Sequence, residues 1–289
     1  MTEKKSGYVA IIGRPNVGKS TLINALIGEK ITIVTSKPQP TVQNIIGILN
    51  DEDSQIILVD TPGLVSNKKI ASHNKTFNKS VLDALASSDV IVMLSEANKW
   101  TKTDEQLLEQ IDAQSLPSIH VVNKVDRFKD KTKILDFLKE HSYLDTFSDV
   151  IPISAKYHKN LDSLLGVIKG HLPNHHLDYD DEISTDQDLH FRISEALRER
   201  LMENLKDELP YKFDCVIETF EEKDKVFLIE MVILVNKQAH KKIIIGKQGQ
   251  LLKKIGSVND LGEYLRPVSY THLRAHETDS YLVCRLLLE

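Results

Sequence analysis

An eight-residue string near the N-terminus constrains the fold of this chain more than any other feature. Residues 13–20 read Gly-Arg-Pro-Asn-Val-Gly-Lys-Ser, which fits the phosphate-binding pattern G-x-x-x-x-G-K-[ST]. An apolar run at 8–12 precedes the string, and a helical stretch at 19–27 follows it. Because a strand–loop–helix unit lets loop amides converge on an anion at a helix N-terminus, the string predicts a site for phosphate groups.

The residue types in this string have separate expected roles. Gly13 and Gly18 permit backbone angles that a side chain would forbid. The Lys19 ammonium can reach the β and γ phosphates of a nucleotide, and the Ser20 hydroxyl can ligate Mg²⁺. The expected nucleotide-contacting residues of this segment are Gly13, Asn16, Val17, Gly18, Lys19, Ser20 and Thr21.

The composition is that of a globular chain without a global sign of a polyanionic partner. The 289 residues are enough for two domains, and the formal net charge of -5 means that any nucleic-acid site must be local. Two cysteines are too few for a disulfide framework, no apolar run approaches the ~20 residues of a membrane span, and the N-terminus lacks a signal-like apolar core. We therefore expect a cytoplasmic protein.

Apolar runs alternate with amphipathic stretches in the first part of the chain. The expected strands are 8–12, 44–49, 55–60, 90–94, 118–123 and 149–153, and the expected helices are 19–27, 79–87, 103–113, 130–140 and 160–170. This alternation predicts an α/β fold with a mostly parallel sheet that helices cover on both faces. Phosphate sites in such sheets lie at the carboxyl ends of the strands.

A change of pattern near residue 171 indicates a second domain. We expect a nucleotide-binding domain at 1–170, a linker at 171–188 and a smaller α+β domain at 189–265. The expected elements of the smaller domain are a long helix to about Leu209, strands at 211–220 and 226–235, a charged turn at 221–225, and two helices around a Gly-x-x-Gly loop.

Further pieces of a nucleotide site follow the predicted strands. Asp60-Thr61-Pro62-Gly63 ends the third strand, where Asp60 can hold a Mg²⁺-bound water and the Gly63 amide can meet the γ-phosphate. The loop before the second strand should supply a threonine to Mg²⁺. Thr35 and Thr41 are the candidates, and we favour Thr41.

Two more loops predict a preference for guanine. Asn123-Lys124-Val125-Asp126 follows the fifth strand, and the Asp126 carboxylate can accept hydrogen bonds from guanine N1–H and the 2-amino group. Adenine lacks both donors there, so the carboxylate would be left unpaired. Asn123 should brace the loop, and the Lys124 stem should cover the base. In the loop Ser154-Ala155-Lys156, the Ala155 amide can donate to guanine O6.

The Gly246-Lys247-Gln248-Gly249 loop lies between two predicted helices. Such a loop is the backbone clamp by which KH domains grip about four nucleotides of single-stranded RNA. Lys241, Lys242, Lys247, Lys253 and Lys254 cluster near it in the sequence. The expected RNA-contacting residues are Lys242, Gly246, Lys247, Gln248, Gly249 and Lys253. A helix–turn–helix joint with solvated lysines is the alternative.

Together these motifs resemble the Era family, bacterial Ras-like GTPases with a C-terminal KH domain. The resemblance covers residues 6–256 and implies a P-loop GTPase domain followed by a type II KH domain. It implies GTP hydrolysis, Mg²⁺ as cofactor, GTP and GDP as ligands, and a role in 30S subunit assembly through small-subunit ribosomal RNA near its 3′ end. It also implies peripheral contact with the inner face of the cell membrane, and we expect a monomer.

The sequence departs from its relatives in ways that bear on hydrolysis. The switch segment reads Gln39-Pro40-Thr41-Val42 where the family has Gln-Thr-Thr-Arg, and Leu64 stands where Ras-like enzymes have a water-orienting glutamine. We expect slow intrinsic turnover and hypothesise K⁺-stimulated hydrolysis, because some relatives with asparagine at the position of Asn16 use K⁺. The expected catalytic residues are Asn16, Lys19, Thr41 and Gly63. A nucleotide-gated RNA adaptor with negligible turnover is the alternative.

The tail has no family counterpart from about residue 266. We hypothesise a foreign or frame-shifted end at 266–289, which would leave the KH-type domain incomplete. The segment 281–288 is nevertheless apolar enough to imitate the missing final strand.

Overall fold

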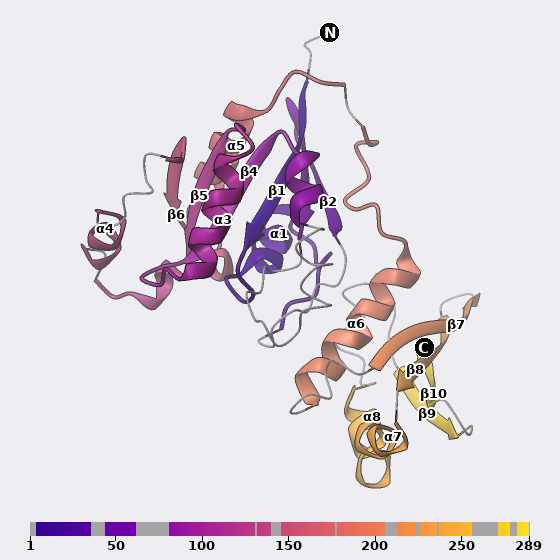
Figure 1. The fold of residues 1–289 in the computed structure, drawn as a ribbon. Coiled ribbons are helices and arrows are strands. Elements are labelled where there is room, and N and C mark those ends of the chain that lie inside the picture. The colour runs from indigo at the N-terminus through magenta and orange to yellow at the C-terminus, as the bar shows by residue number, and fades with distance from the viewer. Residues whose placement is uncertain are drawn as a thin grey trace. The chain divides into compact units, whose positions relative to one another are not determined.

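The chain forms two compact units in a computed structural model (Figure 1). The structure describes residues 4–35, 44–61, 81–130, 132–139, 146–176, 178–205, 213–223, 226–235, 237–255, 271–277 and 282–288. Met1–Thr32 and Pro38–Asp186 make up the first unit, and Ile33–Lys37 and Gln187–Glu289 make up the second. Within the second unit, the Val34 amide donates to Glu199 Oε1 at 2.9 Å.

A six-stranded sheet forms the centre of the first unit. Its strands are β1 (Lys5–Gly13), β2 (Ile45–Asn50), β3 (Ser54–Asp60), β4 (Val90–Glu96), β5 (Ser118–Asn123) and β6 (Asp149–Pro152). The order is β2-β3-β1-β4-β5-β6, and β2 pairs antiparallel with β3 whereas the other pairs are parallel. The predicted mostly parallel α/β sheet is confirmed.

Helices cover both faces of this sheet (Figure 1). The helices are α1 (Lys19–Ile27), α3 (Lys102–Asp112), α4 (Thr132–Lys139) and α5 (Leu161–His171), with a further helical turn at 81–86. Side chains of α1 and α5 pack with Val9 and Ile11, whereas those of α3 and 81–85 pack with Ala10 and Ile12 on the opposite face. Successive β1 side chains thus point to opposite faces of the sheet and pack in two apolar layers, which are both buried.

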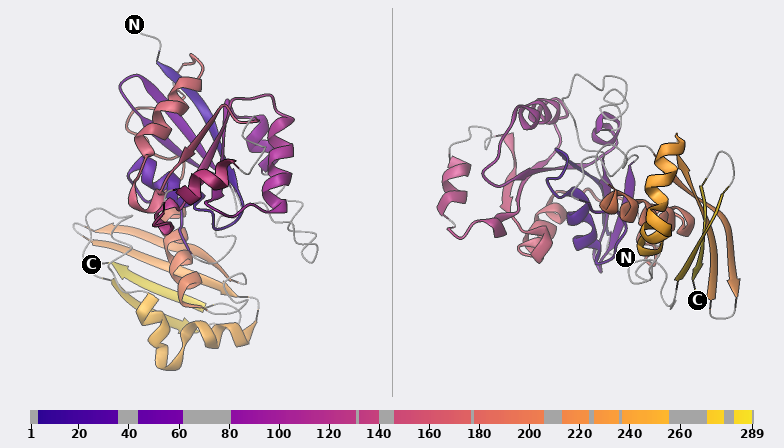
Figure 2. Two further views of the ribbon diagram at one scale, coloured as in Figure 1. Left: turned by 90° about the vertical axis from the view of Figure 1, so that its left-hand side faces the viewer. Right: turned by 90° about the horizontal axis from the view of Figure 1, so that it is seen from below.

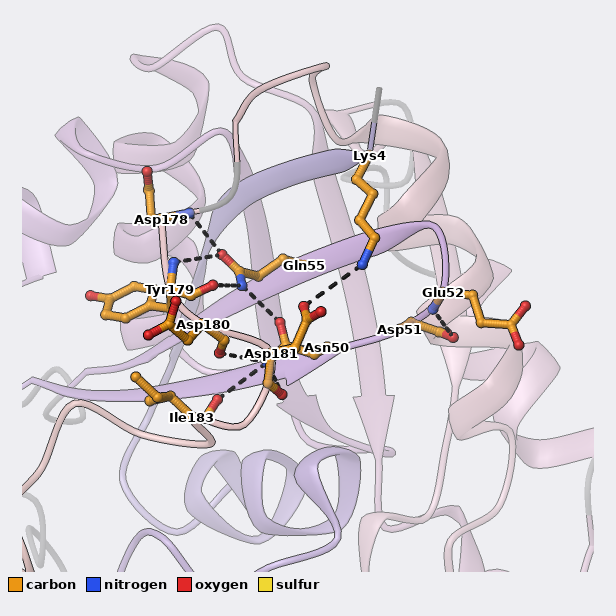
Figure 3. A network of polar contacts seen from close by, with 10 residues as sticks. All are labelled: Lys4, Asn50, Asp51, Glu52, Gln55, Asp178, Tyr179, Asp180, Asp181 and Ile183. Atoms are coloured by element: carbon orange, nitrogen blue, oxygen red, sulfur yellow. Dashed lines mark hydrogen bonds and ion pairs between the residues drawn. The ribbon is translucent and has the colours of Figure 1, made fainter. Parts of the chain in front are cut away.

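Part of the expected linker is attached to the edge of the sheet. The Gln55 side chain accepts from the amides of Asp178 and Tyr179 at 3.0 and 3.2 Å, and it donates to Tyr179 O at 2.8 Å (Figure 3). Ser184 O accepts from Ile48 N at 2.8 Å. These contacts pair the segment 178–185 with strands β2 and β3 of the first unit.

The second unit is a four-stranded sheet with helices on one face (Figure 2). Its elements are α6 (Leu189–Asn204), β7 (Phe213–Lys223), β8 (Val226–Val235), α7 (Gln238–Ile245), α8 (Gln250–Ile255), β9 (Thr271–Glu277) and β10 (Leu282–Leu288). Apolar side chains of α6, α7 and α8 pack with Cys215, Ile229, Met231 and Ile233 of the sheet. The smaller α+β architecture is confirmed.

Two element ends in this unit differ from the sequence-based predictions. Helix α6 ends at Asn204 rather than near Leu209, because Leu205 adopts an extended backbone. Strand β7 continues to Lys223, so charged residues expected in the turn belong to the strand and pair with the start of β8. Helix-forming residues after 204 led to a helix predicted too long, and the charges of 221–223 led to a strand predicted too short.

The tail contributes backbone pairing to the second sheet. Strand β10 lies between β8 and β9 and is antiparallel to both. The apolar segment expected to imitate a final strand therefore forms one. A foreign origin of this tail stays a prediction, as do the expected domain boundaries. Among the described residues, no helix is both long and apolar enough to cross a membrane.

Candidate functional site

The predicted nucleotide-binding pieces meet at one edge of the first sheet. Gly13, Asp60 and Asn123 are the last residues of β1, β3 and β5, and Ser154 follows β6 by two residues. Because these strands are parallel, their carboxyl ends lie at the same edge. Thr41, Gly63 and Leu64 lie outside the described residues, whereas the alternative Thr35 lies within them and is half-buried.

The phosphate loop is held tightly at its second glycine. Gly18 has a φ of 106°, and a Cβ there would lie 2.4 Å from Asn123 Nδ2. The same Nδ2 donates to Val17 O at 2.9 Å, and Val17 is buried. Only glycine combines this backbone angle with so close an approach.

Lys19 lies inside the loop and is 7% exposed. Its Nζ donates to Gly13 O at 3.2 Å and to Arg14 O at 3.3 Å. Burial lowers the pKa of Lys19 to about 8, although the negative charge of Asp60 opposes the shift. A buried ammonium surrounded by loop carbonyls is stabilised by a bound anion, so the arrangement suits a polyphosphate.

Ser20 and Asp60 form the best candidate for a divalent cation site. Ser20 Oγ donates to Asp60 Oδ2 at 2.8 Å, and Asp60 is fully buried at the end of β3. Thr61, the residue after Asp60, is anchored to β1, since its Oγ1 donates to Ile11 O at 2.9 Å. Hydroxyl and carboxylate oxygens are hard ligands of the kind Mg²⁺ takes. The residues present therefore fit the metal that the sequence predicts.

Asn123 joins three loops through one buried side chain. Besides its bond to Val17 O, its Oδ1 accepts from Lys124 N at 2.7 Å and from Ala155 N at 3.1 Å. The predicted bracing role of Asn123 thus has a geometric basis. The Ala155 amide was expected to donate to guanine O6, so a base would have to share or replace its bond to Asn123.

The carboxylate of Asp126 faces solvent beside a buried hydroxyl. Asp126 is exposed, and its Oδ1 accepts a short hydrogen bond from Ser154 Oγ, which is fully buried. The carboxylate follows a left-handed turn at Lys124, with φ 65°, and lies in the 3₁₀ turn Val125–Arg127. Ser154 thereby orients the group predicted to select guanine, and the N1–H and 2-amino group of a guanine can reach an exposed carboxylate.

Lys124 connects this loop to the phosphate loop. Its Nζ donates to Asn16 O at 2.6 Å and lies 3.4 Å from Glu96 Oε2. Burial lowers the pKa of Lys124, and the charge of Glu96 opposes that shift. Arg127 also pairs with Glu96. The sequence-based reasoning missed Glu96, although its position at the carboxyl end of β4 was a usable signal.

The Gly-x-x-Gly loop has the expected place between α7 and α8. Gly246 has a φ of 72°, and a Cβ there would lie 2.7 Å from Leu251 Cβ. Lys247 and Gln248 are exposed at the loop, and Lys242 is exposed on α7. Lys241 is only 7% exposed, so it does not belong to the exposed basic surface that the sequence pattern indicates. The side chain of Lys253 lies outside the described residues.

The first unit has a phosphate loop with the loop from Asn123 to Asp126 braced against it. The second unit has a Gly-x-x-Gly loop between two helices. These features define a P-loop GTPase joined to a KH domain. Family models agree: a 50S ribosome-binding GTPase model matches residues 8–124, and a KH domain model matches residues 208–259. The predicted fold class is thereby confirmed in both units.

Full-length relatives identify the family. The chain is 40% identical over 267 residues to GTPase Era of Vibrio vulnificus, covering 88% of this chain and 82% of that protein. It is 41% identical over 254 residues to GTPase Era of Pseudomonas fluorescens, covering 88% and 84%. The chain belongs to the Era family of GTPases.

Solved structures of that family share the fold. A crystal structure of Era in complex with MgGDPNP and nucleotides 1506–1542 of 16S ribosomal RNA superimposes with a TM-score of 0.83 at 34% identity, covering 88% of this chain and 86% of that one. An Aquifex aeolicus Era variant bound to GDP·AlF₄⁻ gives the same TM-score and identity, covering 87% and 86%.

Proposed function

We propose that this GTPase uses GTP binding and hydrolysis to control a KH domain that binds small-subunit ribosomal RNA during 30S assembly. One observation carries the proposal: Asn123 joins the phosphate loop at Val17 to the loops that hold Asp126 and Ala155. The predicted triphosphate site and the carboxylate proposed to select guanine would thus be parts of one braced structure. The relative crystallised with MgGDPNP and 16S ribosomal RNA supports the RNA half of the proposal.

Separate groups of residues would hold the phosphates, the base and the metal ion. The loop amides from Asn16 to Ser20 and the Lys19 ammonium would bind the phosphates, while Asp126 would read the base. Mg²⁺ would be held by Ser20 directly and by Asp60 through a water, with Thr41 as the expected third residue. When bound, that ion neutralises charge on the β and γ phosphates.

Hydrolysis in this chain is proposed to be slow without a partner. Leu64 has no group that can orient a water, so positioning must come from the Gly63 amide, Thr41 and Lys19. Asn16 is exposed in the phosphate loop, and we expect its side chain to contact K⁺ at the transferring phosphate, as the resemblance implies. A monovalent cation there would add the positive charge that an arginine supplies in other GTPases.

The RNA site is proposed at the exposed loop of the second unit. Gly246 and Gly249 both have positive φ angles, and the space around Gly249 is open. A backbone without side chains lets phosphates approach, while Lys242 and Lys247 neutralise them. Cytoplasmic localisation, a monomeric state and peripheral membrane contact stay predictions.

Phosphate release under multiple turnover tests the enzymatic half. We expect release from GTP and not from ATP, abolished in Lys19→Ala and faster in KCl than in NaCl at equal ionic strength. Tight GTP binding with no release beyond one equivalent would favour the adaptor alternative. Equal rates in the two salts would refute the role of Asn16 toward K⁺.

RNA binding is tested with a labelled single-stranded RNA of the 16S 3′-end sequence. Affinity is measured by fluorescence anisotropy with GTP analogue and with GDP. The paired variants Lys247→Gln in the loop and Lys133→Gln on α4 have the same charge change at different sites. If Lys247→Gln alone binds the RNA more weakly than wild type, the RNA site is supported at the Gly-x-x-Gly loop. If the two variants bind the RNA with the same affinity, that site is refuted.

A further inference from the structure

Arg14 lies in the phosphate loop, but its side chain binds Asp104 and the backbone of Lys99. Its Nε lies 2.6 Å from Asp104 Oδ2 and 2.8 Å from Oδ1, and a terminal nitrogen donates to Lys99 O at 3.0 Å. The Arg14 side chain is 11% exposed and that of Asp104 is fully buried. An arginine in such a loop is chemically suited to phosphate. Here a buried carboxylate already compensates its charge.

Asp104 is itself fixed by the first turn of α3. Its Oδ2 accepts from Thr101 N at 2.9 Å and from Thr101 Oγ1 at 2.8 Å, and the Asp104 amide donates back to Thr101 O at 2.8 Å. This capping box satisfies the helix N-terminus, whose partial positive charge also favours the carboxylate. Leu107 and Ile111 of the same helix are buried and pack against the sheet. Arg14 is therefore tied to an element that cannot shift easily.

The other end of Arg14 lies in the phosphate loop. Its carbonyl accepts from Lys19 Nζ, and the loop turns at Asn16 two residues later. The far side of that turn is held by Asn123 at Val17 O. Side chains therefore hold the loop before the turn through Asp104 of α3, at the turn through Lys124, and after it through Asn123 of β5.

We propose that the Arg14–Asp104 pair is a positioning pair that holds the first half of the phosphate loop in the shape that receives nucleotide. The inference rests on the proposed function, because it concerns the same phosphate site. Arg14 acts through the backbone of Gly13 to Asn16 rather than by contact with phosphate. Loss of either partner leaves a buried charge without compensation and loosens the loop.

The release rate of a fluorescent GDP analogue, measured by stopped flow, separates this role from direct phosphate binding. Arg14→Gln and Asp104→Asn should each speed release about tenfold, and the double variant should be no faster than the worse single variant, because the pair acts as a unit. If Arg14 were a phosphate ligand, freeing it by Asp104→Asn would leave release unchanged or slower, which would overturn the proposal.

Two further variants keep the test decisive. Arg14→Lys preserves the charge but cannot contact Asp104 and Lys99 O together, so it should release faster than wild type, whereas release at the wild-type rate contradicts the proposal. Lys169→Gln, which removes an exposed ion pair with Asp51, is the control and should release normally. A purely structural pair would lower the melting temperature without changing release from protein that is folded at the assay temperature.

Failure of the inference differs from failure of the proposed function. Wild-type protein that does not bind the GDP analogue, or binds the ADP analogue equally, contradicts the proposed function itself. Guanine-selective binding by wild type with unchanged release in every Arg14 and Asp104 variant overturns only the positioning role.

Discussion

Replacing Asn123 by alanine should damage nucleotide binding although Asn123 is expected to make little contact with phosphate. Asn123 is 2% exposed, and its side chain makes three hydrogen bonds, with Val17 O, Lys124 N and Ala155 N. At about 1 kcal/mol net per bond, the variant loses about 3 kcal/mol from the junction of three loops. If that energy holds the binding-ready shape, GDP affinity should fall about a hundredfold.

The assay compares GDP affinity by fluorescence titration with urea unfolding of the same protein. The matched control is Asn50→Ala, which removes an asparagine bonded to Asp181 O at the opposite end of the sheet. That variant should keep its GDP affinity even if its stability falls. A change of less than threefold in Asn123→Ala, with the folded state intact, would refute the bracing argument.

Three other perturbations have defined outcomes. Lys19→Ala should weaken GTP far more than guanosine in calorimetry, since only the phosphates lose a charged partner; equal losses would contradict this. Gly246→Ala should destabilise the second unit by about 1–2 kcal/mol in chemical denaturation and weaken RNA binding, because its φ of 72° disfavours a side chain; an unchanged midpoint would count against it. Burial raises the pKa of Glu195, even though Arg198 opposes the shift, so the protonated acid favours folding and this contribution is lost as pH rises past the raised pKa. Glu195→Gln should therefore gain melting temperature relative to wild type as pH rises above the ordinary glutamate pKa of about 4.5, and a difference independent of pH would refute the assignment.

The phosphate site was predictable because its signals are local. The string from Gly13 to Ser20 lies between a Val- and Ile-rich run and a helical stretch, and the structure has a strand and a helix there. The same holds for the runs that end at Asp60 and Asn123, since each polar residue terminates a buried strand. The alternation of predicted strands and helices then indicated a parallel sheet, in which the phosphate loop, Asp60 and Asn123 lie at one edge.

Contacts between distant residues were not predictable from such patterns. Arg14 and Asp104 are 90 residues apart, and each alone is an ordinary charged residue in the sequence. Gln55 binds a segment 123 residues away through backbone amides, which leave no side-chain signature. The end of α6 was misplaced for the opposite reason, since helix-forming residues continue past Asn204 while the backbone turns away at Leu205.

Nucleotide selectivity at Asp126 is the most direct test of the proposed guanine-nucleotide site. Binding of GTP and ATP is measured by calorimetry for wild type and for Asp126→Asn, with Mg²⁺ present. We predict a strong preference for GTP in wild type and a weaker preference in the variant, because the carboxamide cannot accept from both guanine N1–H and the 2-amino group. Undiminished preference for GTP in Asp126→Asn would contradict it.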